Sequence, residues 1–249
     1  MPRITDHEAR KKDILLASIE IYLNSATPVS SDSLRKRKNL ALSSASVRHV
    51  FGELEEMGLM THPHTSAGRI PTDEGYRLYL DALMRKKKLT SRETDFIDKI
   101  YELKVQELDS LFEETSKIMS DFTHYTSLVY FHAASGDLTY AQGIRYLLEH
   151  PEFSDIHKVQ GILEALEKKE ELIDLINRNF SGKTQVYIGK ETDCPQMESC
   201  SVVVSRYESK RKQGGRLALI GPKRMAYDQV IPLIEYVSEA ISRNIERFE

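Results

Sequence analysis

Several features that mark large classes of protein are scarce in this sequence of 249 residues. Its two cysteines, Cys194 and Cys200, have no third metal ligand nearby, so neither a disulfide framework nor a zinc site is indicated and both are expected to be reduced thiols. No window approaches the roughly 18 consecutive apolar residues of a membrane span. The opening MPRITDHEARKKD also lacks the apolar centre of a signal peptide. We therefore expect a cytoplasmic protein with no membrane partner.

Catalytic patterns are missing as well. No Ser/His/Asp, Cys/His or paired-carboxylate arrangement stands at a meaningful spacing, which argues against an enzyme. We expect no catalytic residues, no cofactor and no metal.

The charge is distributed unevenly over the chain. An apolar content of 40% with 29% charged residues describes a globular protein able to bury a core. Residues 1–89 carry a balance of +4, whereas the remainder carries −7. This division predicts a basic module followed by an acidic one, and a basic module can approach nucleic acid.

The first third of the chain reads as three helices. Residues 12–25 have apolar residues at helical spacing, and Pro28 stops that helix. A short helix follows, with Ser30, Ser31 or Asp32 as the candidate N-cap. The third helix is expected to begin at a cap supplied by Ser43 or Ser44 and to end at Gly58. Its apolar residues fall at i, i+3, i+4 and i+7, which predicts a buried stripe of Val47, Val50, Phe51 and Leu54.

The opposite side of this third helix is polar. Its first turns carry Ser43, Ser44, Ser46, Arg48 and His49, whereas its last turns collect glutamates. This arrangement suits a helix that enters a DNA groove by its N-terminus, because phosphates repel the acidic end. We expect Ser44, Ser46 and His49 to contact base edges and Arg48 to hold phosphate. The alternative for Arg48 is an intramolecular salt bridge with an acidic residue such as Glu20.

The stretch THPHTSAGRIPTDEGYRLYLDAL, residues 61–83, has little apolar material in its first fifteen residues. We interpret it as a wing: Leu59 and Met60 start a strand, Gly68 supplies the turn, Arg69 and Ile70 return, and Thr72 caps a fourth helix. The residues expected along phosphates or in the minor groove are His64, Thr65, Ser66 and Arg69. A metal site at His62 and His64 is disfavoured, because no third ligand lies nearby in the sequence.

The remaining chain is predicted to combine helices with a sheet. Residues 92–122 have apolar positions every three or four residues, which favours one long helix, either a dimer seam or a helix packed on the chain's own C-terminal domain. Beyond it we expect a mixed sheet with a hairpin turn at Gly214-Gly215. The expected strands are TSLVYFHAA, KTQVYIGKE, SCSVVVSRY and GRLALIGP, and the expected helices are 139–149, 156–179 and 226–248.

The predicted fold class is α+β, with an N-terminal winged helix-turn-helix, a long linking helix and a C-terminal α/β domain. The expected boundaries are 1–88 for a winged-helix DNA-binding domain, 89–125 for a linking or dimerisation helix, and 126–249 for the C-terminal domain. A dimer would place two copies of residues 43–57 in successive major grooves, so its target is an inverted repeat in double-stranded DNA.

Two separated blocks resemble one known family. LSSASVRHVFGELEEMGLMTHPHTSAGRIPTDEGYRLYLDAL, with the signature at residues 63–77, is similar to the DNA-binding module of the heat-inducible transcription repressors of the HrcA family. HPEFSD, VYIGKE, CSVVVSRY and IGPKRMAYDQVI follow the order of that family's C-terminal part. The resemblance covers most of the chain except roughly residues 90–135.

The resemblance implies a cytoplasmic, dimeric repressor of chaperone operons, with a GAF-like C-terminal domain. It also implies an inverted-repeat operator, called CIRCE, and support by the GroEL chaperonin. Direct thermosensing and ligand sensing, without the chaperonin, are the alternatives. The chain departs from the family pattern in two ways: an insert before HPEF that helps dimerisation is largely missing, and His49 replaces an amide side chain.

Overall fold

The computed structural model describes residues 3–39, 42–63, 68–83, 88–132, 136–168, 170–178, 182–210 and 214–248. The chain divides into two compact units, Met1–Met84 and Arg85–Glu249. Each unit has its own buried apolar residues, so each is described by itself.

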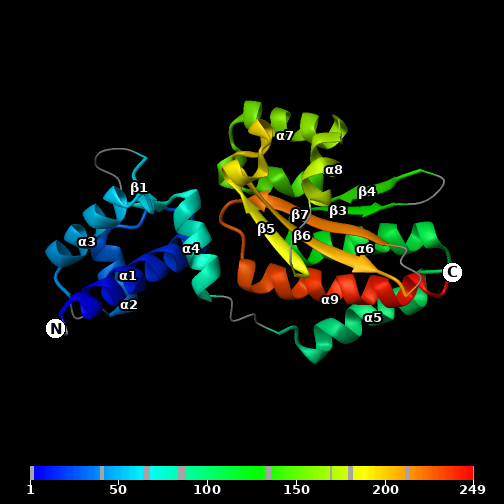
Figure 1. Ribbon diagram of the computed structural model, residues 1–249, viewed down its shortest axis with the longest axis horizontal. Helices are drawn as coiled ribbons and strands as arrows, with labels where there is room; N and C mark the ends of the chain where they lie inside the picture. The colour runs from blue at the N-terminus through cyan, green and yellow to red at the C-terminus, as the bar shows by residue number, and fades with distance from the viewer. Residues whose placement is uncertain are drawn as a thin grey trace. The chain divides into compact units, whose positions relative to one another are not determined.

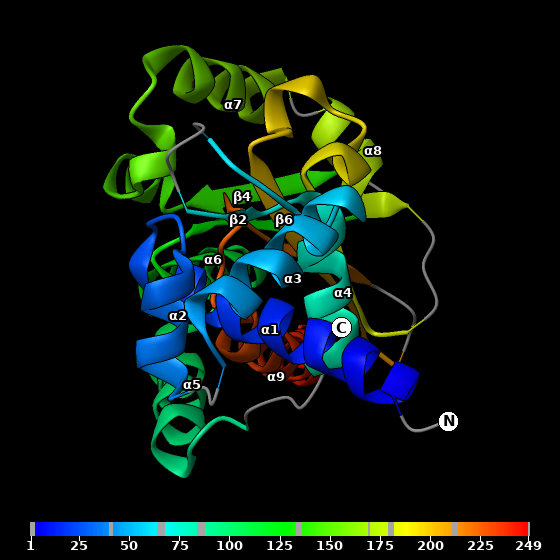
Figure 2. The same cartoon turned by 90° about the vertical axis from the view of Figure 1, so that its left-hand side faces the viewer.

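The N-terminal unit contains four helices and a short ribbon among its described residues (Figures 1 and 2). In chain order these are α1 (Arg3–Ser25), α2 (Ser31–Lys38), α3 (Ser44–Glu56), β1 (Met60–Thr61), β2 (Ile70–Pro71) and α4 (Asp73–Leu83). Both views show α1 lying among α2, α3 and α4, and its Ile14, Leu15 and Ile19 are buried. The antiparallel pairing of β1 with β2 confirms the predicted return of the chain at Ile70.

The C-terminal unit is built on a five-stranded sheet with the order β4-β3-β7-β6-β5. The strands are β3 (Thr126–Phe131), β4 (Leu138–Gln142), β5 (Thr184–Ile188), β6 (Cys200–Glu208) and β7 (Gly214–Pro222). Every pairing is antiparallel, so the predicted mixed sheet is wrong. The long β6–β7 pair, which joins Cys200 to Pro222 and Glu208 to Gly214, forms the centre of the sheet.

Helices cover both faces of this sheet (Figure 1). On one face lie α6 (Leu108–Thr123) and α9 (Tyr227–Ile245), with α5 (Ser91–Lys104) packed against both of them. On the other lie α7 (Ile156–Lys168) and α8 (Glu170–Asn177), together with the 3-10 turns η1 (Ile144–Glu149), η2 (Pro151–Phe153), η3 (Gly189–Thr192) and η4 (Pro195–Met197). Strands buried on both faces explain the near-continuous apolar runs of β6 and β7.

The predicted single helix over residues 92–122 is wrong. The chain instead forms two helices, α5 and α6, which pack side by side. A hydrogen bond of 2.8 Å between the hydroxyls of Tyr101 and Thr115 joins them. Between them Val105 is buried with an extended backbone. The Ser110 hydroxyl accepts hydrogen bonds from the backbone N–H groups of Gln106 and Glu107, which fixes the turn. The apolar spacing continues through the break, so periodicity alone did not reveal it.

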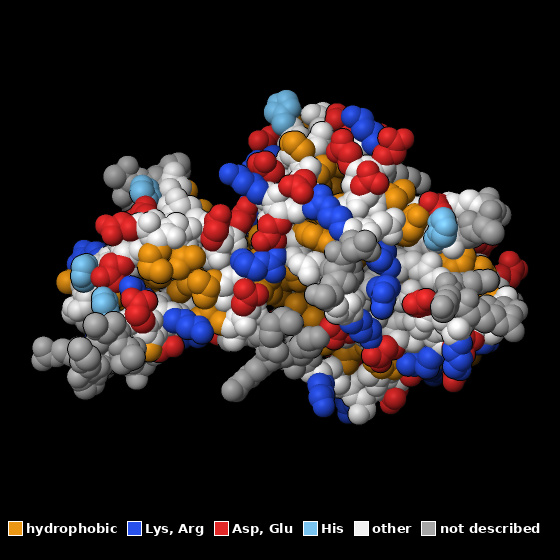
Figure 3. Space-filling model, viewed as in Figure 1, with side chains coloured by type: hydrophobic (Ala, Val, Ile, Leu, Met, Phe, Trp, Pro, Cys, Tyr) orange, Lys and Arg blue, Asp and Glu red, His pale blue; other side chains and the backbone are white. Residues whose placement is uncertain are grey.

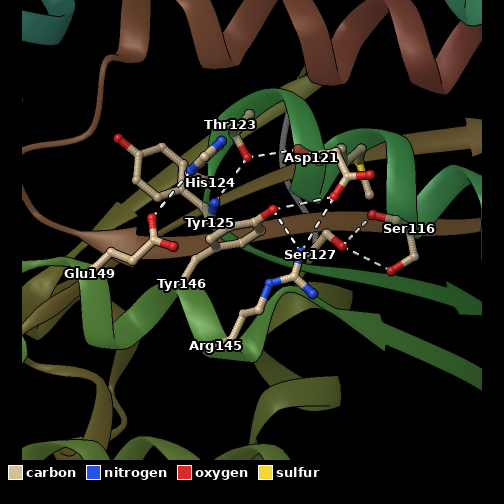
Figure 4. A network of polar contacts seen from close by, with 10 residues as sticks. Ser116, Asp121, Thr123, His124, Tyr125, Ser127, Arg145, Tyr146 and Glu149 are labelled. Carbon is tan, nitrogen blue, oxygen red and sulfur yellow. Dashed lines mark hydrogen bonds and ion pairs between the residues drawn. The ribbon is translucent and has the colours of Figure 1, made fainter.

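The helix expected at residues 139–149 is also wrong. Residues Leu138–Gln142 are strand β4, paired with β3, and the η1 turn begins after Gly143. At Gly143 the backbone has a φ of 77°, and a Cβ there would lie 2.0 Å from the Ser120 hydroxyl, so the position needs glycine. Contacts from the end of α6 hold η1 in place (Figure 4): His124 lies 3.2 Å from Glu149, and the Tyr146 hydroxyl donates to Asp121 over 3.3 Å.

Two smaller expectations also change. The helix expected over 156–179 is two helices, α7 and α8, on either side of residue 169, which lies outside the described residues. Gly214 and Gly215 do not form a hairpin turn but begin strand β7. At Gly215 a Cβ would lie 1.8 Å from the backbone oxygen of Tyr130 on β3, so close strand approach accounts for this glycine.

The two cysteines are free and buried. Burial raises the pKa of the Cys200 thiol to about 12 and also raises the pKa of Cys194, where the Glu171 carboxylate adds to the effect. Because the thiolate is the reactive form, we expect a chromogenic disulfide reagent at pH 8 to modify neither thiol rapidly in the native protein. After unfolding in guanidinium both should react at the rate of a free thiol. Rapid modification of Cys200 before unfolding would contradict its placement in the core.

Among the described residues, no helix combines the length and apolarity needed to cross a bilayer. On the face of the C-terminal unit drawn in Figure 3, acidic and basic side chains are interspersed rather than separated by sign.

Candidate nucleic-acid interface

The start of α3 is fixed by local hydrogen bonds. Ser43 is the N-cap, and its hydroxyl accepts a hydrogen bond of 3.0 Å from the backbone N–H of Ser46. Beyond the helix, Gly58 has the expected left-handed backbone, with a φ of 71°. The predicted buried stripe is confirmed, because Val47, Val50, Phe51 and Leu54 are all buried. Packing of this stripe turns the opposite side of the first turns to the surface.

Small hydroxyls, one arginine and one histidine occupy that surface. The exposed side chains are Ser43, Ser46, Arg48 and His49, and Ser44 is half-buried. The hydroxyls of Ser43 and Ser46 are hydrogen-bonded to each other over 2.9 Å. Ser44 instead donates to the carboxylate of Asp32, which belongs to α2. The predicted residues of α3 therefore lie at its cap and in its first two turns, and all are at least partly accessible.

The arginine and the histidine of α3 differ in their surroundings. The His49 side chain is 77% exposed, and its Nε2 lies 3.7 Å from Glu53, which also contacts His7 over 3.1 Å. Arg48 forms no ion pair among the described residues. Its expected alternative partner, Glu20, is paired with Lys38 instead, so that alternative is wrong. Arg48 therefore remains available to an external anion.

Arg69 was predicted to contact DNA, but in the structure it also makes contacts within its own unit. Its backbone N–H and C=O pair with Val29 over 2.9 and 2.8 Å, which ties the ribbon to the loop before α2. Its Nη2 lies 2.9 Å from Glu55, and its side chain is 24% exposed. A DNA contact by this guanidinium must compete with Glu55. The neighbouring Gly68 is required, because a Cβ there would lie 2.5 Å from the carbonyl carbon of Val29.

The other predicted wing residues are described only in part. His64, Thr65 and Ser66 lie outside the described residues. The His62 ring contacts the carboxylate of Glu55, and the same carboxylate also pairs with Arg69. Across the described ranges of the chain, no cluster of three metal-ligating side chains is found. Thr72 caps α4 as expected, because its hydroxyl accepts a hydrogen bond of 3.1 Å from the backbone N–H of Gly75.

A basic group on α2 was missed by the sequence analysis. This helix ends in Arg35, Lys36, Arg37 and Lys38, and the last three are exposed. Ser30 caps its start by accepting from the N–H of Ser33 over 3.1 Å. The run RKRK was visible in the sequence, and its place directly before α3 was the signal that could have identified it.

Comparison with known proteins adds independent information. Residues 130–231 match the family described as HrcA protein C terminal domain. A Geobacter sulfurreducens protein named heat-inducible transcription repressor HrcA is 29% identical to this chain, and the match covers 98% of this chain and 99% of that protein. This chain is a homologue of the HrcA proteins. The HrcA protein of Desulforamulus reducens is 27% identical, with 96% of this chain and 97% of the relative covered.

The HrcA relatives are longer than this chain. The match to the Geobacter protein spans 340 alignment positions, whereas this chain has 249 residues, so at least 91 positions have no counterpart here. This agrees with the expectation that the chain is shorter than typical HrcA proteins. A crystal structure of a hypothetical protein shares the fold, with a TM-score of 0.79, 18% identity and coverage of 96% of this chain and 99% of that one.

Proposed function

We propose that this HrcA homologue is a sequence-specific DNA-binding transcription repressor whose N-terminal unit acts as a winged helix-turn-helix. The observation that carries the proposal is the front of α3, meaning its cap and first two turns, which present hydroxyls, an arginine and a histidine beside a fully buried apolar stripe. The major groove of DNA admits an α-helix in this orientation. The HrcA relatives are themselves named transcription repressors.

The exposed residues take different roles in this proposal. Ser44, Ser46 and His49, beside the cap Ser43, contact base edges and read sequence. The phosphate or minor-groove contacts come from Arg48, His64, Thr65, Ser66 and Arg69, joined by the cations of α2. Arg69 exchanges its ion pair with Glu55 for the more concentrated negative charge of the DNA.

A homodimer is part of the proposal, because two-fold symmetry matches an inverted repeat. Helix α5 carries two apolar stripes. Ile97 and Tyr101 are buried within the unit, whereas Phe96 is 55% and Leu103 is 67% exposed, with Ile100 half-buried between them. Beside this second stripe, which we call the α5 seam (Phe96, Ile100 and Leu103), lies a groove of about 490 Å³ between α5 and α6. Helical spacing and exposure support the α5 seam as the dimer contact.

The C-terminal unit is proposed to be GAF-like and to couple the repressor to cell stress. Its five-stranded antiparallel sheet between two helical layers supports the first assignment. Large apolar side chains are exposed at Leu148 and Ile156, which supports recognition by a chaperonin that binds apolar surface. By resemblance to the relatives, the targets are chaperone operons with a CIRCE inverted repeat, and GroEL supports activity.

The chaperonin dependence can be tested by titration. Added GroEL should raise the fraction of protein that binds operator DNA, because the chaperonin returns non-native chains to the active form. Unchanged operator binding across the titration, together with reversible loss of binding by the purified protein over a few degrees, would assign heat sensing to the repressor itself.

Ligand sensing is the second candidate for the C-terminal unit, and one cavity favours it. A pocket of about 310 Å³ lies between the start of α5, the end of α6 and the start of α9. Its walls include Leu89, Phe122, Tyr125, Val230 and Leu233. A ligand there would contact the capped first turn of α5, where the Thr90 N–H donates to Glu93 over 2.7 Å. A small-molecule screen by thermal melting tests this candidate.

The DNA-binding proposal itself is tested with duplexes enriched by the wild-type protein from random-sequence DNA. We expect enrichment of an inverted repeat, protected in a footprint over two half-sites about one helical turn apart or a multiple of it. Affinity should fall steeply with salt, because bound cations release counterions from the phosphates. Failure to enrich any duplex would reject the function.

The role of His49 gives a separate prediction. His49→Ala should lower base selectivity at one position of each half-site by about 1 kcal/mol or more, while leaving the salt slope nearly unchanged. His49→Asn should sharpen selectivity for adenine, because an amide pairs bidentately with that base and imidazole does not. Arg48→Ala is the matched control on the same face, expected to weaken all duplexes equally and to reduce the salt slope by about 1. A reduced slope with intact selectivity in His49→Ala would assign His49 to the phosphate backbone.

A further inference from the structure

One hydrogen bond joins the front of α3 to the helix before it. Asp32 lies in the first turn of α2 and is exposed. Its carboxylate accepts a hydrogen bond from the hydroxyl of Ser44, the first residue of α3. Ser44 is half-buried and is one of the residues that the proposed function assigns to base contact.

The direction of this hydrogen bond follows from charge. An ionised carboxylate can only accept hydrogen bonds, so the single proton of the Ser44 hydroxyl points at Asp32. The Ser44 hydrogen bond, with the nearby charges of Arg35 and Arg48, holds the pKa of Asp32 below its usual range. Asp32 is therefore ionised at neutral pH, and the lone pairs of Ser44 are all that this hydroxyl can offer to another molecule.

The neighbouring hydroxyls are not restricted in this way. Ser43 and Ser46 share a hydrogen bond of 2.9 Å in which either oxygen can be the donor. Exchange of that proton leaves Ser46 able to donate to a base or to accept from one. Ser44 is thus distinguished from the other two serines at the front of α3 by its fixed polarity.

We propose that Asp32 is a positioning residue that makes Ser44 a hydrogen-bond acceptor only, and thereby sets the base preference at one position of the operator. In the major groove the amino groups of adenine and cytosine are donors, whereas guanine and thymine present acceptors at the corresponding places. Ser44 then selects an adenine or cytosine amino group and disfavours the guanine O6 or thymine O4. This inference rests on the proposed DNA-binding function and adds to it the chemistry of one contact.

The test compares three variants with the wild type on the enriched inverted repeat and on every single base-pair substitution of one half-site. Asp32→Ala removes the acceptor and frees the Ser44 proton. Asp32→Asn removes the charge but keeps an acceptor oxygen, so it separates the effect of the hydrogen bond to Ser44 from the effect of the negative charge. Ser44→Ala removes the contact itself. Circular dichroism and melting of each variant confirm that α3 is folded before binding is measured.

We expect Asp32→Ala to reduce discrimination at one base pair by about fivefold to tenfold, the lower range of a base contact. Asp32→Asn should keep the wild-type preference there. Both variants should bind all duplexes somewhat more tightly, because each removes a negative charge near phosphates. In a Ser44→Ala background, Asp32→Ala should have no further effect at that base pair, as expected for two residues that act through one contact.

Three results would overturn the proposal. The first is that Asp32→Ala leaves the base preference unchanged at every position. The second is that Asp32→Asn loses as much base preference as Asp32→Ala does. The third is that Asp32→Ala still has its full effect on base preference in the Ser44→Ala background. Each of these leaves selective DNA binding by the wild type intact. Absence of selective binding by the wild type is a different outcome, and it rejects the proposed function itself.

Discussion

Replacing Phe96 and Leu103 together by glutamate is expected to convert the proposed dimer to a monomer and to weaken binding to a complete inverted repeat by about 100-fold or more. Both side chains belong to the α5 seam and are exposed within one chain, so the substitutions leave the buried stripe of Ile97 and Tyr101 in place. Affinity for an isolated half-site should change little. The large loss arises because a dimer binds its second half-site at a high effective concentration, which a monomer lacks.

The reason for the dissociation is the burial of apolar surface at the proposed contact. Burying one large apolar side chain stabilises an association by about 1.5 to 3 kcal/mol, and two-fold symmetry repeats each contribution. A glutamate at the same position must either lose its hydration or separate the helices. Two adjacent pairs of glutamates would also repel across the axis.

Sedimentation equilibrium measures the dimer, and a duplex carrying one half-site or two measures the DNA effect. Leu148→Glu is the matched control, because Leu148 is 69% exposed in the same unit but lies on η1 and not on α5. That variant should remain dimeric. A dimer that survives the double substitution would show that the α5 seam is not the contact, and a monomeric wild type would reject the homodimer.

Local patterns in the sequence were sufficient to predict the front of α3. The cap, expected at Ser43 or Ser44 and found at Ser43, the buried stripe from Val47 to Leu54 and the left-handed Gly58 each depend on residues close together in the sequence. Spacing and residue type therefore determine them. The exposure of Ser46, Arg48 and His49 follows directly from that helix phase.

Long-range contacts could not be predicted in the same way. The Ser44–Asp32 hydrogen bond and the Arg69–Glu55 ion pair join residues on different elements, and nothing in their local sequence specifies the partner. The helix expected at 139–149 failed for a related reason. Pairing of residues 138–142 with β3 outweighed local helical spacing, and the left-handed backbone of Gly143 ended the strand.

The break between α5 and α6 shows a third limit. Apolar residues continue at spacings of three and four across residues 104–108, so a continuous helix and a helical hairpin have the same pattern. Burial of Val105 and capping by Ser110 distinguish them, and both depend on tertiary packing. Packing within the unit also leaves Phe96 and Leu103 at the surface, which the pattern alone did not separate from Ile97.

The second large effect is expected from Gly215→Ala, which should destabilise the C-terminal unit by about 3 kcal/mol or more. A Cβ at this position would lie 1.8 Å from the backbone oxygen of Tyr130 and 2.9 Å from the Tyr207 hydroxyl. That buried hydroxyl donates to the same Tyr130 oxygen over 3.0 Å, so the methyl group would displace either the hydrogen bond or strand β3. Neither can move far, because β7 lies between β3 and β6 in the sheet.

Gly161→Ala in α7 is the matched control, since it makes the same chemical change in the same unit. Its Cβ would meet only ordinary contacts, the nearest being Gln196 at 3.6 Å. Replacing a glycine inside a helix by alanine should stabilise by up to about 1 kcal/mol. Thermal melting should therefore lower Tm by roughly 6 to 12 °C for Gly215→Ala and raise it slightly for Gly161→Ala. An unchanged Tm in Gly215→Ala would mean that β3 and β7 do not approach as closely as described, and the close packing of the sheet at Tyr207 would have to be abandoned.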